Sequence, residues 1–183
     1  MRRLLFAVIL LGASTALADP GASSGLRKRY DPGFSAGALT SVRGYEGLDG
    51  AAVAAGVDVG WAFDLVDFHL SVQQSLAAVV EHRPTYLGAN LEYAFATVGG
   101  FSVLGTTGLD LVLDGPDRQT GHAGGDLFGP ELGLGARYRV TPLVDVVATA
   151  TVGLWLPTHG PRRMFVEPGL TGGLIFHPFA SVN

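Results

Sequence analysis

Hydrophobic residues occupy every second position along residues 51–80. In the first half of this stretch, one parity holds Val53, Ala55, Val57, Val59, Trp61, Phe63 and Leu65. The other parity holds Ala54, Gly56, Asp58, Gly60, Ala62 and Asp64. In the second half, Val66, Phe68, Leu70 and Val72 alternate with Asp67, His69, Ser71 and Gln73. A side-chain period of two is typical of β-strands, so the stretch predicts two strands joined by almost no loop.

The same alternation predicts eight strands in the chain: 33–43, 51–64, 66–80, 85–96, 100–113, 128–140, 143–156 and 163–176. The predicted connections alternate in length. Longer ones span 44–50, 81–84, 114–127 and 157–162, and the others contain only residues 65, 97–99 and 141–142. An even number of strands, each about as long as a tilted strand that crosses a membrane, predicts an all-β, eight-stranded, antiparallel up-and-down transmembrane β-barrel.

Aromatic residues of outward parity lie near the ends of the strands that carry the short connections. They are Phe34, Trp61, Phe63, Phe68, Tyr93, Phe95, Phe101, Tyr138 and Phe176. Membrane barrels carry such aromatic girdles at the lipid–water interface, together with short periplasmic turns and longer extracellular loops. At the other end, Tyr86 and Trp155 have inward parity. We therefore expect the short connections on the periplasmic side and the long ones outside the cell.

Composition and the amino terminus agree with this architecture. Hydrophobic residues make up 48% of the chain and charged residues 15%, yet no uncharged apolar run after residue 18 approaches the twenty residues of a membrane helix. Arg2 and Arg3 precede an apolar run, and Ala16-Leu17-Ala18 has the form of a cleavage site. We therefore expect residues 1–18 to be a cleaved secretory signal peptide, 19–32 a short periplasmic lead and 33–183 the barrel domain.

The last predicted strand contains Thr171-Gly172-Gly173-Leu174-Ile175-Phe176. This segment resembles the carboxy-terminal assembly signal of small outer-membrane barrels, although seven residues follow Phe176 in the sequence. In overall pattern the chain resembles the small eight-stranded outer-membrane β-barrel family, of which the OmpA-like transmembrane domain is a familiar member. The resemblance implies residence in the outer membrane of a Gram-negative bacterium.

Charged and ionisable residues share the inward parity, which predicts a polar lumen. They are Arg43, Asp58, Asp64, Asp67, His69, Glu92, Asp110, Glu131, Arg137, Arg139, Asp145 and Glu167. Burying an unpaired charge is costly, so we expect these groups to pair, with Arg137 and Arg139 near Asp145 and Arg43 near Glu167. A soluble, ligand-carrying barrel of lipocalin type would have its apolar parity inside, and is disfavoured. Carboxylates outnumber bases here, which leaves a narrow cation-preferring channel as an alternative.

Catalytic chemistry has one candidate, the His69-Leu70-Ser71 segment. Its His-x-Ser spacing resembles the lipid A deacylase family, so a lipid-modifying enzyme of that type is a second alternative. These residues have lumen parity and lie near the periplasmic end, whereas an enzyme acting on surface lipid needs its nucleophile at the outer leaflet. We therefore predict no enzymatic activity and a structural role for His69.

The longest predicted connection, 114–127, is the candidate recognition loop. Its charged and ionisable residues are Asp114, Asp117, Arg118, His122 and Asp126. Loops on a rigid scaffold commonly carry binding sites, so an extracellular ligand would bind here. The chain has no cysteine, and no histidine spacing matches a metal motif, so we expect no metal and no cofactor.

These observations together predict a monomeric outer-membrane protein with a structural or surface-recognition role. Its partners would be outer-membrane lipid and an extracellular ligand, and no sequence signature of nucleic-acid binding is present.

Overall fold

The computed structural model describes residues 33–44, 51–63, 66–77, 83–116, 123–158 and 164–178. They form eight strands: β1 (Gly33–Gly44), β2 (Ala51–Phe63), β3 (Val66–Ser75), β4 (Thr85–Val98), β5 (Phe101–Pro116), β6 (Ala123–Thr141), β7 (Val144–Pro157) and β8 (Phe165–Phe176). The predicted signal peptide and periplasmic lead lie outside the described residues. No helix in the described ranges is long and apolar enough to cross a membrane.

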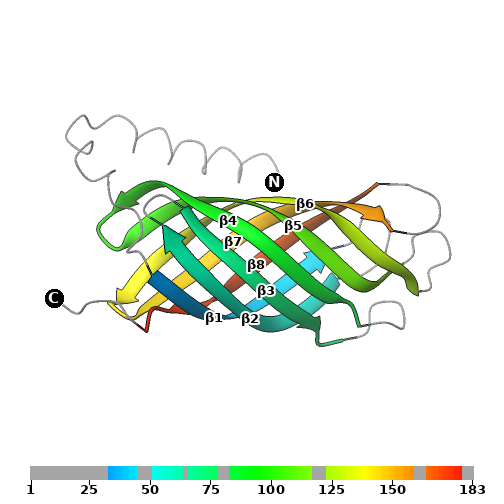
Figure 1. Cartoon of the computed structure of the whole chain (residues 1–183), viewed down its shortest axis with the longest axis horizontal. Helices are drawn as coiled ribbons and strands as arrows, with labels where there is room; N and C mark the ends of the chain where they lie inside the picture. The colour runs from blue at the N-terminus through cyan, green and yellow to red at the C-terminus, as the bar shows by residue number, and fades with distance from the viewer. Residues whose placement is uncertain are drawn as a thin grey trace, which may run out of the picture.

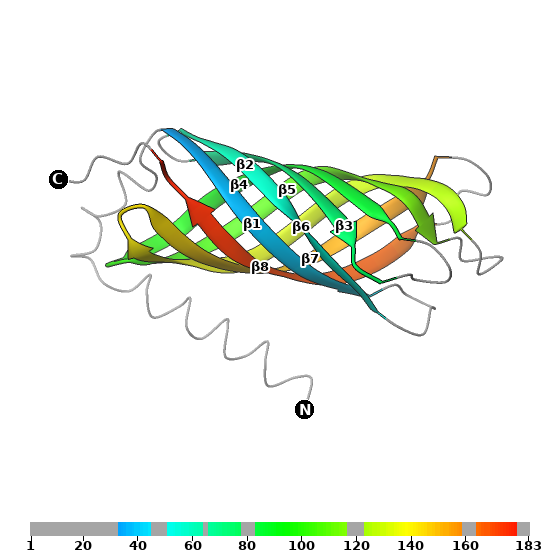
Figure 2. The ribbon, with the colours of Figure 1, turned by 90° about the horizontal axis from the view of Figure 1, so that it is seen from below.

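The strands form one closed, up-and-down barrel. Each strand pairs antiparallel with its neighbour in sequence, and β8 pairs with β1 to complete the circle, from Ala36 opposite Phe176 to Arg43 opposite Gly169. Closure leaves no sheet edge along the wall, which is what a β-structure needs in order to cross hydrocarbon. Figures 1 and 2 show an elongated barrel with strongly tilted strands. The predicted fold class is confirmed.

The wall is apolar outside and polar inside. Each of the eight strands exposes at least one large hydrophobic side chain, and examples are Val57, Leu70 and Leu134. The alternate positions are buried, as in the regular exposed–buried alternation of β2 and β7. A soluble barrel would bury the larger hydrophobic side chains instead. The outer surface is therefore suited to lipid.

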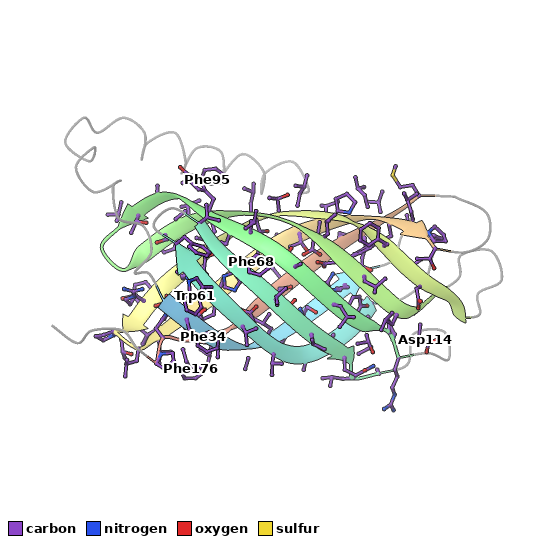
Figure 3. All side chains as sticks on the ribbon, in the orientation of Figure 1. Phe34, Trp61, Phe68, Phe95, Asp114 and Phe176 are labelled. Atoms are coloured by element: carbon purple, nitrogen blue, oxygen red, sulfur yellow. The ribbon has the colours of Figure 1, made fainter. Side chains whose placement is uncertain are left out.

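The predicted aromatic girdle surrounds one end of this surface. Figure 3 shows Phe34, Trp61, Phe68, Phe95 and Phe176 toward one end of the barrel and Asp114 at the opposite end. The remaining predicted members are Phe63, Phe101 and Tyr138, which are exposed, and Tyr93, which is partly buried. The ring of Tyr93 packs edge-on against that of Phe95, with centroids 5.3 Å apart.

Three predicted strand boundaries are wrong. The third strand was expected to reach residue 80, but β3 ends at Ser75 because the chain turns there: the Ser75 hydroxyl donates to the carbonyl of Ala77 (2.7 Å). The fifth and sixth strands extend beyond their predicted ends, to Pro116 and back to Ala123. The ladder between β5 and β6 continues through this Gly-rich segment with two register shifts between Val112 and Pro116.

Proline at position 168 is compatible with β8. Val152 of β7 pairs with Pro168, whereas the ladder between β8 and β1 ends one residue away, at Gly169. Pro168 therefore lies beyond the last β1 pair, where a missing backbone N–H removes no ladder bond to that strand.

Candidate functional site

The lumen holds the predicted charge network. Ten of its predicted members are buried: Arg43, Asp58, Asp67, His69, Glu92, Asp110, Glu131, Arg137, Asp145 and Glu167. The side chain of Arg139 is 38% exposed. Asp64 lies outside the described residues. The charged groups within the described part of the chain form two clusters at different depths.

We call the end of the barrel with the long connections its outer end. The outer cluster lies in the lumen toward this end and is built around Arg43, near the last residue of β1. Its Nη1 lies 2.9 Å from a Glu131 oxygen and 3.1 Å from a Glu167 oxygen, and its Nη2 lies 4.0 Å from Asp110. The guanidinium also stacks on the ring of Tyr86, 4.5 Å from its centroid. One cation therefore faces three carboxylates that come from β5, β6 and β8.

The inner cluster lies near the end with the short connections. Arg137 of β6 crosses the lumen to Asp67 of β3 (3.3 Å) and Glu92 of β4 (2.5 Å), and it is 3.9 Å from Asp145. Arg139 bonds Asp145 at 3.1 Å. Asp145 has a further partner in His177, at 2.9 Å.

Sequence reasoning missed His177, because it follows the predicted end of the last strand. A parity signal was available, since residue 177 shares the inward parity of the buried Ile175.

His69 lies between two carboxylates. Its Nδ1 is 2.7 Å from an Asp58 oxygen, and its Nε2 is 3.1 Å from an Asp67 oxygen. Both ring nitrogens are therefore directed at acids. A deacylase-like mechanism would require Ser71 as the partner of His69. Both residues are described and line the same lumen cavity, but no hydrogen bond joins them.

An apolar cluster occupies the outer end of the lumen. Tyr86 and Trp155 are almost completely buried, and they pack with Ala52, Ala54, Val112, Leu127 and Phe165. Tyr86 lies near the start of β4 and Trp155 near the end of β7, beside the long connections. Two large rings at this level obstruct a small barrel whose interior has room for side chains and little more.

A cavity of about 90 Å³ separates the two charge clusters. Arg43 and Glu131 line it from the outer cluster, and Glu92 lines it from the inner cluster, beside Asp58 and His69. A space of this size holds a few water molecules.

The β5–β6 hairpin extends beyond the rest of the wall at the outer end. The last pair of β4 with β5 is Thr85 with Leu113, and the last pair of β7 with β6 is Pro157 with Leu127. Beyond those pairs only the two strands of the hairpin continue, which adds roughly 10 Å to the wall. Figure 2 shows β5 and β6 reaching farthest at this end.

Two members of the predicted recognition loop therefore lie in strands, which corrects the prediction of a loop at 114–127. The backbone N–H of Asp114 donates to the Asp126 carboxylate (3.3 Å), and Thr158 donates twice to the Asp126 carbonyl. These bonds attach the hairpin to the end of β7. Asp117, Arg118 and His122 lie outside the described residues.

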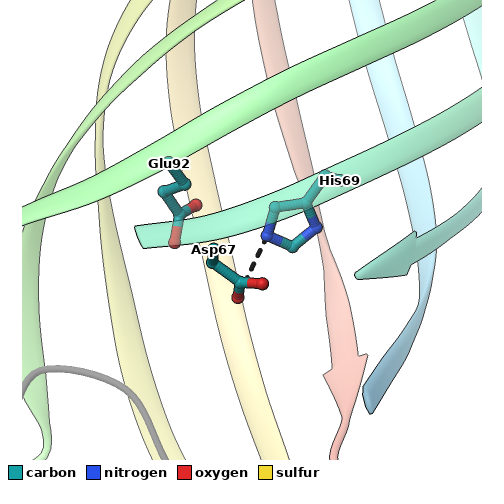
Figure 4. A group of neighbouring side chains, drawn as sticks. All are labelled: Asp67, His69 and Glu92. Atoms are coloured by element: carbon teal, nitrogen blue, oxygen red, sulfur yellow. Dashed lines mark ion pairs between the residues drawn. The ribbon is translucent and has the colours of Figure 1, made fainter. Parts of the chain in front are cut away.

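A possible metal-binding group is formed by Asp67, His69 and Glu92, whose ligand atoms lie within 4.8 Å of one another (Figure 4). The spacing of histidines along the chain, on which the prediction of no metal rests, does not indicate this group. These ligands come from two adjacent strands, β3 and β4.

Comparison with known proteins identifies similar folds. No protein-family model matches the sequence, and no curated protein matches it. Among solved structures, the chain is similar to the N-terminal β-barrel domain of Pseudomonas aeruginosa OprF (19% identity, TM-score 0.54, 78% of this chain and 97% of that one).

It is also similar to Neisserial surface protein A, with 17% identity and a TM-score of 0.55 over 79% of this chain and 95% of that one. The third similar structure is Ail of Yersinia pestis, with 12% identity and a TM-score of 0.51 over 78% of this chain and 95% of that one. The chain has the fold of a small eight-stranded outer-membrane β-barrel.

Proposed function

We propose that this protein is a monomeric barrel of the Gram-negative outer membrane with a surface-recognition role, and that the β5–β6 hairpin makes the contact with an extracellular ligand. The extension of the hairpin beyond both neighbouring strands carries this proposal. A rigid wall that positions one projecting element is a common design for recognition. The exposed apolar band on all eight strands would hold the barrel in lipid.

The residues of the hairpin also suit a polar ligand. Asp114 is exposed at the rim, and the sequence between the strands contributes Asp117, Arg118 and His122. Asp126 has a supporting role in this proposal, because its carboxylate and carbonyl bond within the wall. Among proteins of similar fold, Ail is named as an attachment invasion locus protein and another as a surface protein, which is compatible with a role at the cell surface.

The test is a binding screen with the purified barrel in lipid nanodiscs, against arrays of cell-surface glycans and extracellular matrix proteins. We expect binding that is lost when residues 115–125 are replaced by an Asn-Gly turn. The control variant changes only the opposite end, by replacing Gly99-Gly100 with Asn-Gly, and should bind as well as the wild type. No binding to either array, or binding that survives removal of the hairpin tip, would contradict the proposal.

A lack of enzymatic activity is part of the same proposal. Nδ1 of His69 is 2.7 Å from Asp58 and Nε2 faces Asp67 at 3.1 Å, so both nitrogens are directed at aspartates and not at Ser71, which supports a structural role over a role as base for Ser71. A general base must be within hydrogen-bonding reach of the proton that it removes. Measurable lipid A deacylation by the purified protein, abolished in Ser71→Ala, would overturn this part.

The alternative of a cation-preferring channel rests on the acidic excess of the lumen, where seven buried carboxylates accompany two buried arginines. The apolar cluster at the outer end argues against a continuous path. In planar bilayers we therefore expect no steady conductance from the wild type. The double variant Tyr86→Ala/Trp155→Ala should conduct, with a preference for cations. Steady wild-type conductance would show that these rings do not close the lumen.

A further inference from the structure

Three side chains that donate electron pairs converge in the lumen. Asp67 and His69 are two positions apart on β3, so they lie on the same side of the strand, and Glu92 is the direct cross-strand partner of Asp67 on β4. Their oxygen and nitrogen atoms lie within 4.8 Å of one another, and all three residues are buried (Figure 4). Arg137 places one positive charge beside the two acids, and the group keeps an excess of negative charge when His69 is neutral.

Asp58 orients the ring of His69. The short distance of 2.7 Å from His69 Nδ1 to Asp58 Oδ2 is that of an N–H donated to a carboxylate. The other nitrogen, Nε2, then faces Asp67 at 3.1 Å. In a neutral imidazole this second nitrogen carries a lone pair, so either a proton or a metal ion must lie between it and the acids. A carboxylate behind a histidine is the usual support of a histidine that ligates a metal.

Asp67 has unused capacity for a ligand. Its side chain is completely buried, and its Oδ1 makes no hydrogen bond among the described residues. Its other oxygen, Oδ2, contacts Arg137 and His69. A buried carboxylate oxygen without a partner is uncommon, since almost all buried polar atoms are satisfied. Oδ1 is therefore available to an ion without loss of an existing bond.

The charges of the group match a divalent cation. Asp58, Asp67 and Glu92 contribute three negative charges, and Arg137, which bonds Asp67 and Glu92, contributes one positive charge. With a neutral His69 the group has a net charge of −2. One divalent ion brings it to zero, whereas a proton on His69 leaves −1. Arg137 can remain in place, because it bonds Oδ2 of Asp67 and Oε1 of Glu92.

We propose that Asp67, His69 and Glu92 bind one divalent transition-metal ion, with Zn²⁺ as the expected occupant. One imidazole and two carboxylates form a ligand set that Zn²⁺ accepts, and three protein ligands leave a coordination position for water. The cavity of about 90 Å³ lies against His69 and Glu92 and provides room for that water. The ion would link β3 to β4 and, through Asp58, to β2.

The test is metal content after folding. The refolded protein in detergent is stripped with a chelator, equilibrated with Zn²⁺, desalted and measured by elemental mass spectrometry, with Co²⁺ absorption as a second readout. We expect the wild type to retain one more zinc ion per chain than His69→Gln or Glu92→Gln. His177→Gln is the matched control: it also removes a lumen imidazole beside a carboxylate, and it should retain the ion.

Asp58→Asn keeps the test informative if the ligand variants fail to fold, which their heat-modifiable gel mobility would reveal. Loss of this supporting carboxylate should weaken Co²⁺ binding about 10- to 100-fold. Any metal bound by histidines in the connecting segments is the same in the wild type and in every variant, so it cancels in the comparison. Three results would overturn the proposal: no zinc in the wild type, equal zinc in His69→Gln, or unchanged Co²⁺ affinity in Asp58→Asn. The positive charge beside the two acids would then come from a proton on His69.

Discussion

Replacing Arg43 with methionine should lower the free energy of unfolding of the barrel by about 3–5 kcal/mol or prevent folding altogether. Methionine keeps much of the length of the side chain but removes the charge. Glu131, Glu167 and Asp110 would then share a buried site without a cation, and the three are 1–7% exposed. Breaking a buried ion pair from one side is strongly destabilising because the remaining charge stays desolvated.

Arg139→Met is the matched control. The Arg139 side chain is 38% exposed, and its partner Asp145 keeps His177 and Arg137 as partners. We expect a loss of no more than about 1 kcal/mol, as for other solvent-accessible pairs. The measurement is urea unfolding in lipid vesicles, followed by tryptophan fluorescence and heat-modifiable mobility. Equal losses in the two variants would contradict a buried outer cluster.

A second comparison separates charge from packing. Neutralising the two nearest acids together with the base should restore much of the lost stability, because apolar or neutral groups of similar shape can replace most of a buried ion network. Arg43→Met/Glu131→Gln/Glu167→Gln should therefore be more stable than Arg43→Met alone. If the triple variant were less stable, the packing of Arg43 on Tyr86 would be the dominant contribution.

The sequence predicted the wall of the barrel because strand physics is local. Alternation assigns each residue to the lumen or to lipid, and short connections force neighbouring strands to pair, as between Phe63 and Val66. Because a closed barrel pairs β8 with β1, Arg43 and Glu167 were expected to be neighbours. In the structure, Arg43 Nη1 lies 3.1 Å from Glu167 Oε1. The strand ends were less predictable. A hydroxyl-to-carbonyl bond ends β3 at Ser75, whereas a Gly-rich stretch that resembled a loop forms bulged strands.

The contacts across the lumen could not be read from the sequence. Parity gives the side to which Arg137 points, and its sequence position suggested Asp145. In the structure its shorter contacts are Asp67 and Glu92, from strands on another part of the wall. Those distances depend on the shear and tilt of the closed barrel, which are properties of all eight strands together. The convergence of Asp67, His69 and Glu92 was missed for the same reason.

Replacing Leu134 with arginine should cost about 2–4 kcal/mol if the apolar face lies in a bilayer. Leu134 is an outward residue of β6, four positions from the girdle residue Tyr138. With a strand tilt of about 40°, four residues correspond to roughly 10 Å along the barrel axis, close to the middle of an apolar band about 25 Å tall. A cation there is far from water on either side.

Tyr138→Arg tests whether depth is the cause. Both side chains are similarly exposed, Leu134 at 56% and Tyr138 at 54%, and both lie on the same face of one strand. In water the two substitutions would have similar small effects, within about 0.5 kcal/mol of the wild type. At the interface a cation costs only about 0–1 kcal/mol, so in lipid the two losses should differ by about 2–3 kcal/mol. Unfolding in vesicles measures that difference, and equal losses would mean that this face does not lie against hydrocarbon.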